Sequence, residues 1–151
     1  MIVSLSGTWR SRADPEARGE REQWFEAGAS APDAPGWAAC AVPSCWNSDP
    51  RFERYEGAFW YATDFSLPRE LEPWRTRAAL RFNAVNYFCR VWVNGAEAGT
   101  HEGGFLPFEI ALDAAALQPV NRLVVMAENR REDTRIPGRV CDWYNYGGIV
   151  R

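Results

Sequence analysis

The chain has 151 residues, 46% of them hydrophobic, and a formal net charge of -3, which suits one folded domain of ordinary size. That length excludes a complete (β/α)₈ barrel, which typically needs about 250 residues. The acidic balance argues against a protein that binds nucleic acid through its charge. We find no signal peptide and no apolar run long enough to cross a membrane, so we expect a cytoplasmic protein without a membrane partner.

The composition favours strands over helices. Aromatic residues make up 14% of the chain, and 12 glycines and 10 prolines provide frequent turns. Aromatic side chains are enriched in strands, and glycine and proline separate one strand from the next. All 17 basic residues are arginines, so every cationic side chain is a planar fork of donors.

The first half of the chain predicts short strands joined by loops. We expect strands over residues 5–9, 37–42 and 59–65, and loops over 12–36 (with one helical turn), 44–54 and 68–74. Trp24 and Phe25 should pack onto the core from the first loop. Pro43 should end the second strand, because proline lacks the N–H group that strand pairing needs.

The second half continues the pattern. We expect strands over 77–85, 86–93, 96–100, 105–112 (interrupted at Pro107) and 123–129, a helical turn over 114–117, and an arginine-rich loop over 130–140. Asn94-Gly95 is a strong hairpin signal, since both residues accept a positive φ. About eight short strands without a long amphipathic helix predict an all-β fold, an antiparallel sandwich or jelly roll.

The four cysteines fit no zinc or redox motif. Cys40, Cys45, Cys89 and Cys141 are separated by gaps that match no CxxC pattern. We expect free thiols, with a Cys40–Cys45 disulfide as the alternative, and neither a metal site nor a cofactor.

His101 is the only histidine, so any Ser–His–Asp or Cys–His mechanism would have to use it. No G-x-S-x-G motif accompanies it. The glycines that follow predict a tight loop over 101–104. We interpret His101 and Glu102 as structural, with the histidine hydrogen-bonding to hold that loop.

Asp142 is the one acidic residue that its surroundings single out. It lies among Trp143, Tyr144 and Tyr146, just before two glycines. A carboxylate beside aromatic rings suits a sugar, because the acid accepts hydrogen bonds from hydroxyls while rings cover the apolar sugar face. The alternative is that the aromatic rings belong to the core and Asp142 caps a turn.

The arginines of the 130–140 loop allow two interpretations. Arg130, Arg131, Arg135 and Arg139 could together bind an acidic group. The interspersed Glu132 and Asp133 favour a solvated loop whose charges pair with each other.

Motifs along the whole chain resemble the N-terminal sugar-binding domain of family 2 glycoside hydrolases, the β-glucuronidases and β-galactosidases. The matching stretches are Leu5-Ser6-Gly7-Thr8-Trp9, Val42-Pro43-Ser44 with Trp46-Asn47, Gly57 with Phe59-Trp60-Tyr61, Val91-Trp92-Val93-Asn94-Gly95, His101-Glu102-Gly103-Gly104-Phe105 with Pro107-Phe108, Asn121-Arg122-Leu123, and Asn145 through Arg151. Each is a weak signal alone, and their shared order is specific.

The resemblance implies a galactose-binding-like jelly-roll β-sandwich in a larger exo-glycosidase. The catalytic glutamates of the family belong to a barrel that these 151 residues do not include, so the resemblance assigns no catalytic residue here. Asp142, before N-Y-G-G-I-x-R, matches an aspartate that in the family binds a sugar hydroxyl in the barrel pocket. The partners implied are therefore a carbohydrate and an intramolecular barrel.

Two departures from the family pattern refine this expectation. Gly57-Ala58 stands where some galactosidases carry a substrate-contacting Asn, which favours a β-glucuronidase over a β-galactosidase. The family domain also continues past G-G-I-x-R, so we expect residues 1–151 to be one domain truncated before its last strand. The alternatives are a free-standing carbohydrate-binding module and a structural domain that assembles as a homo-oligomer.

Overall fold

The computed structural model describes residues 2–68 and 77–151, and they form a nearly all-β structure. Its strands are β1 (Gly7–Asp14), β2 (Ala38–Val42), β3 (Ala58–Ser66), β4 (Ala78–Phe82), β5 (Val85–Asn86), β6 (Phe88–Val93), β7 (Ala96–Glu102), β8 (Phe108–Leu112), β9 (Val120–Glu128) and β10 (Gly148–Ile149). Short 3₁₀ helices lie at Trp46–Ser48, Pro50–Phe52 and Ala114–Ala116. No helix among these residues has the length and apolar character to cross a membrane.

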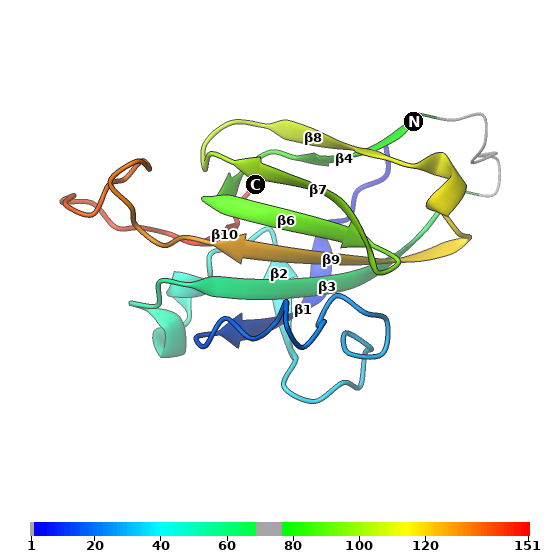
Figure 1. Cartoon of the computed structure of the whole chain (residues 1–151), viewed down its shortest axis with the longest axis horizontal. Coiled ribbons are helices and arrows are strands. Elements are labelled where there is room, and N and C mark those ends of the chain that lie inside the picture. The colour runs from blue at the N-terminus through cyan, green and yellow to red at the C-terminus, as the bar shows by residue number, and fades with distance from the viewer. Residues whose placement is uncertain (1, 69–76) are drawn as a thin grey trace.

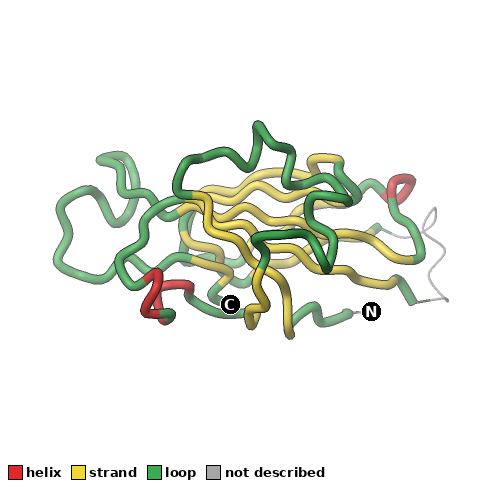
Figure 2. The backbone as a smooth tube through the Cα atoms, turned by 90° about the horizontal axis from the view of Figure 1, so that it is seen from below, coloured by secondary structure: helices red, strands yellow, loops and turns green. Residues whose placement is uncertain are grey.

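The strands form one large sheet and two small ones. The large sheet has six strands in the order β2-β1-β3-β9-β6-β7, and the pairs β4–β8 and β10–β5 complete the set (Figure 1). Every pairing is antiparallel. Figure 2 shows the strands running roughly along the long axis, with loops at the ends of the strands and further loops lying over one face of the sheet. The predicted jelly-roll β-sandwich is confirmed.

The main core lies between the large sheet and the small ones. Because side chains alternate along a strand, Phe59 and Tyr61 of β3 face inward while Trp60 between them faces outward. Leu80 of β4 and Ile110 of β8 close the core from the opposite side. The large sheet also contributes Cys89 and Val91 of β6, and Leu123 and Val125 of β9, to this core.

A second apolar cluster covers the outer face of the large sheet. Trp60 stacks on Trp92 with ring centroids 5.1 Å apart, and the segment 15–37 lies over them. From that segment Trp24 packs edge-on against Trp60 at 5.9 Å, and Phe25 stacks on Trp92 at 5.2 Å. The predicted packing of Trp24 and Phe25 is confirmed. The outer face of the large sheet therefore carries a second, smaller core.

The Asn94-Gly95 hairpin forms as predicted between β6 and β7. Asn94 has φ of 52° and Gly95 of 84°, the left-handed conformations that a tight hairpin requires. The Asn94 side chain also accepts from the Arg122 N–H at 2.9 Å and donates to Asn121 at 2.9 Å. The turn is thereby joined to β9 as well as to its own strands.

Several predicted boundaries were wrong. β1 begins at Gly7 and runs to Asp14, beyond the predicted 5–9, because it pairs with β2 on one side and β3 on the other. The predicted strand 77–85 is two strands, β4 and β5, and the predicted strand 105–112 begins only at Phe108, after the exposed residues that include Pro107. The predicted connection 68–74 lies, apart from Pro68, outside the described residues.

The predicted loop at His101 was also displaced. His101 and Glu102 belong to β7, where they pair with Cys89 and Phe88 of β6, and the chain turns only at Gly103. The His101 ring stacks on Phe108 at 3.7 Å, and its Nε2 atom lies 3.2 Å from the Gly103 carbonyl oxygen. Its interpretation as a histidine that holds this turn is confirmed.

Candidate functional site

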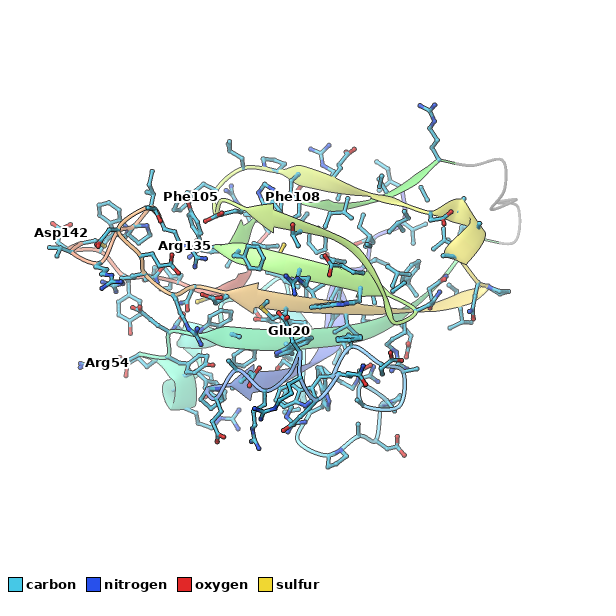
Figure 3. The ribbon with its side chains drawn as sticks, viewed as in Figure 1. Glu20, Arg54, Phe105, Phe108, Arg135 and Asp142 are labelled. Atoms are coloured by element: carbon cyan, nitrogen blue, oxygen red, sulfur yellow. The ribbon has the colours of Figure 1, made fainter. Side chains whose placement is uncertain are left out.

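Asp142 lies on a long loop that joins β9 to β10, residues 130–147, which we call the Asp142 loop. In Figure 1 this loop (orange to red) extends beyond the ends of the strands. Figure 3 shows Asp142 at its outer end, pointing away from the sheet, while Arg135 lies back near the strands. Asp142 is exposed, and no hydrogen bond or ion pair of its carboxylate is found within 2–68 and 77–151. The turn-capping alternative therefore has no contact to support it.

The aromatic residues that follow Asp142 lie at the surface. Trp143 is 57% exposed, Tyr146 55% and Tyr144 43%, so the alternative that places these rings in the core is wrong. Tyr144 stacks obliquely on Tyr146 at 5.0 Å, and its hydroxyl donates to the Glu53 carbonyl at 2.6 Å. The loop thus presents one carboxylate and partly exposed aromatic rings, the kinds of group that a sugar site combines.

The arginines of the Asp142 loop pair mainly with nearby carboxylates. Arg131 Nε lies 2.8 Å from Glu56, and Arg139 Nε lies 3.7 Å from Asp133. Arg135 contacts Glu128 at 3.2 Å and Glu102 at 3.3 Å. The self-paired interpretation therefore holds for Arg139 only. Arg135 lies 3.7 Å from Glu132 of the same loop, but its shorter ion pairs, like that of Arg131, are with carboxylates outside the loop.

The base of the Asp142 loop is fastened by four buried asparagines, which we call the asparagine clasp: Asn47, Asn86, Asn129 and Asn145. The Asn129 amide donates to the Asn145 carbonyl at 3.1 Å, and the Asn145 amide donates to the Asn129 carbonyl at 2.5 Å. Asn47 Oδ1 accepts from the Gly147 N–H at 2.8 Å. Asn86 donates to the Tyr146 carbonyl. Each amide satisfies backbone groups that the loop leaves unpaired.

Sequence reasoning missed the clasp. Asn47 and Asn145 appear in the motifs that indicated the family, but they are 98 positions apart in the numbering and nothing in the spacing pairs them. The available signal was an asparagine directly after a strand, as at Asn129, where a side-chain amide can bond to the chain that leaves the sheet.

An open hollow of about 290 Å³ lies on the outer face of the large sheet, away from Asp142. It is lined by Asp14, Ala17, Glu20, Arg21, Ala58, Trp60, Met126, Glu128 and Arg130, of which Figure 3 labels Glu20. The Asp14 carboxylate accepts from the Arg18 and Gly19 N–H groups, each at 2.8 Å, and from Trp60 at 3.1 Å. Because Trp60 is only 1% exposed, its ring offers no face for a sugar in this hollow.

All four cysteines are free thiols, so the Cys40–Cys45 disulfide does not form. Burial raises the pKa of the Cys40 thiol, and it raises the pKa of the Cys89 thiol to about 12. A raised thiol pKa lowers the fraction of reactive thiolate. These two cysteines are therefore poor nucleophiles at neutral pH.

Comparison with known proteins gives one consistent result. The family model for the sugar-binding domain of family 2 glycosyl hydrolases matches residues 2–151. The β-glucuronidase of Paenibacillus borealis is 30% identical over 173 aligned residues, covering 99% of this chain and 28% of that protein. Human β-glucuronidase is 34% identical over 183 residues, covering 97% of this chain and 27% of that protein.

Solved structures agree with the sequence matches. The Ruminococcus gnavus β-glucuronidase in complex with D-glucuronic acid is 33% identical, with a TM-score of 0.82, and the match covers 99% of this chain and 28% of that one. The same enzyme with C6-substituted uronic isofagomine is 32% identical, with a TM-score of 0.84, covering 99% and 27%. The chain spans little more than a quarter of the length of these relatives. It belongs to the sugar-binding domain family of the family 2 glycosyl hydrolases.

Proposed function

We propose that this chain is the non-catalytic N-terminal domain of an exo-glycosidase that removes terminal β-linked glucuronic acid, with a terminal β-galactoside as the second candidate. The proposal is supported by the names of the relatives, which are β-glucuronidases of 30% and 34% identity. Gly57-Ala58, which departs from the galactosidase pattern, supports the same order of preference.

The chemistry of glycoside hydrolysis suggests which part of the enzyme carries the catalytic groups. A retaining enzyme needs two carboxyl groups about 5–5.5 Å apart on either side of the scissile bond, one as nucleophile and one as acid and base. In this domain, Asp14 is bonded to backbone N–H groups and Glu128 is paired with Arg135. We assign both catalytic carboxyl groups to the barrel and give this domain a role in shaping the sugar pocket.

The observation that carries the proposal is the free carboxylate of Asp142 at the end of a protruding loop. A carboxylate with no partner among residues 2–68 and 77–151 is available to accept hydrogen bonds from a sugar hydroxyl. The exposed rings of Trp143 and Tyr146 beside it add apolar surface for the sugar or for the barrel rim.

The test is substitution of Asp142 in the full-length enzyme. Asp142→Ala should lower kcat/KM for an aryl β-D-glucuronide by a factor of about ten to a thousand, or about 1.4–4 kcal/mol. Asp133→Ala is the matched control, since Asp133 is an exposed carboxylate on the same loop, and among the described residues its ion pair is with Arg139 at 3.7 Å. Equal kcat/KM values for the two variants would show that Asp142 does not contribute to the sugar pocket.

A free-standing carbohydrate-binding module is the alternative function, favoured by the exposed aromatic rings of the Asp142 loop. We expect titration calorimetry of the isolated chain with glucuronic acid, glucose or galactose to show no saturable binding. One carboxylate and one open rim cannot orient a sugar, because ligand sites are concave and surround most of the ligand. Saturable binding would favour the module.

A further inference from the structure

The Asp142 loop is rigid at its base and open at its outer end. Its base is held by the asparagine clasp, whose Asn129 and Asn145 are 1% and 5% exposed. Its outer part is exposed, as at Ile136 (64%) and Val140 (98%). Contacts at the base of the loop and along its length are therefore the ones within this domain that can fix the position of Asp142.

The clasp connects the base to three different parts of the sandwich. Asn129 Oδ1 accepts from the Gly57 N–H at 3.0 Å, at the start of β3. Asn145 Oδ1 lies 3.4 Å from the Asn86 amide of β5. Asn47 donates to the carbonyls of the adjacent turn at 2.9–3.2 Å while it accepts from Gly147. The two ends of the loop are thus fixed to each other and to the sheets.

Arg135 provides a second anchor part of the way along the loop. Its guanidinium pairs with Glu128 of β9 at 3.2 Å and with Glu102 of β7 at 3.3 Å, and it lies over the Tyr87 ring at 5.5 Å. Its side chain is only 12% exposed. Ion pairs of a largely buried arginine are screened less by solvent than surface pairs.

We propose that Asn145 and Arg135 are positioning residues for Asp142. They hold the Asp142 loop in one arrangement before the sugar binds. The loop then does not have to be ordered when the carboxylate accepts a hydrogen bond from the sugar hydroxyl. Ordering a loose loop costs conformational entropy, and a misplacement of about 1 Å can lower a rate about a hundredfold. This inference rests on the proposed function of Asp142.

The experiment is a set of double-mutant cycles in the full-length enzyme. Asn145→Ala and Arg135→Gln are measured alone and together with Asp142→Ala, using an aryl β-D-glucuronide. We expect each to lower kcat/KM about tenfold with Asp142 present, and less than about twofold in the Asp142→Ala background. A merely structural loss of folded enzyme would lower both backgrounds equally.

Matched controls come from the opposite side of the sandwich. Asn83 is exposed and follows β4, and Arg81 is 63% exposed and pairs with Glu109 at 3.5 Å. Asn83→Ala and Arg81→Gln should leave kcat/KM within about twofold of the parent enzyme. If Asn145→Ala fails to fold, as judged by circular dichroism, the Arg135→Gln cycle decides the question.

The outcomes separate the inference from the function on which it rests. If Asp142→Ala lowers kcat/KM but the Asn145 and Arg135 variants do not, or if their losses persist in full without Asp142, the inference is overturned and the proposed function stands. If Asp142→Ala has no effect, the proposed function fails and the inference fails with it. Losses in kcat/KM that depend on Asp142 in both cycles support the inference that Asn145 and Arg135 position Asp142.

Discussion

The Cys89 thiol shows how burial controls a single ionisable side chain. Cys89 is 0% exposed between the sheets, and burial raises its pKa from 9.0 to about 12 because the thiolate would lose its solvation there. Below pH 9 the thiol is protonated in the folded and unfolded chain alike. Above pH 9 the unfolded chain releases this proton while the folded chain keeps it, so the contribution of Cys89 to stability is lost as the pH rises toward 12.

We therefore expect the free energy of unfolding of the chain to fall between about pH 8 and about pH 10. Urea titrations at both values measure the decrease. Cys89→Ala is the comparison, because it removes the thiol and should make the decrease in the free energy of unfolding smaller. Burial also raises the pKa of Tyr55 to about 12. Part of the pH dependence should therefore remain in Cys89→Ala at the upper end of the range. A pH dependence identical in the parent chain and in Cys89→Ala would contradict this account of the thiol.

Gly147 is a second residue whose role follows from its immediate contacts. A Cβ atom there would overlap the indole of Trp46, which is buried and stacked on Phe59 at 5.0 Å. Gly147→Ala should therefore destabilise the chain by about 1–3 kcal/mol. Gly28→Ala is the control, since a Cβ at Gly28 meets nothing within 4 Å. Denaturant unfolding of both variants checks this, and equal midpoints would show that Trp46 moves aside freely.

At the scale of elements, the segment 15–37 acts as a cover for the outer face of the large sheet. Its Trp24 is 4% exposed, contacts Trp60, and has the Arg12 guanidinium 3.6 Å from its ring centroid. Trp24→Ala should lower the free energy of unfolding by about 3–5 kcal/mol, whereas Trp143→Ala at a 57% exposed position should change it by less than about 0.5 kcal/mol. Thermal unfolding of the two variants measures the difference, and similar losses would mean that the segment does not stabilise the sheet.

The elements also show how far sequence reasoning reaches. Alternation identified β6, and Asn94-Gly95 identified its hairpin, because both are local signals with a period or a backbone requirement. The end of β1 was missed, since Arg12 pairs with Trp60, a partner distant in sequence. The end of β7 was missed because the glycines after Glu102 suggested an earlier turn, although His101 still pairs with Cys89 of the same hairpin.

The candidate site could likewise be predicted only in part. The composition around Asp142 and the family motifs indicated that residue, and its exposure is consistent with the suggestion. The asparagine clasp was not predictable, because Asn47 meets the Gly147 N–H, 100 positions further along the chain, only in the folded structure. A polar network between distant segments leaves no periodic trace in a single sequence.

At the scale of the whole molecule, the sandwich is a scaffold whose features converge on one end of the strands. Its core holds β9 and β10 in place, the clasp closes the loop between them, and the loop presents Asp142 beyond the sheet (Figure 3). On this account the domain shapes a sugar pocket and carries no bond-breaking chemistry of its own.

Hydrolysis of 4-nitrophenyl β-D-glucuronide by the 151-residue chain and by the full-length enzyme, measured side by side at equal molar concentration, tests that claim most directly. We predict turnover by the full-length enzyme and a rate equal to the buffer blank for the chain alone. Turnover by the chain well above the blank would contradict the account, because it would place the catalytic carboxyl groups within these residues.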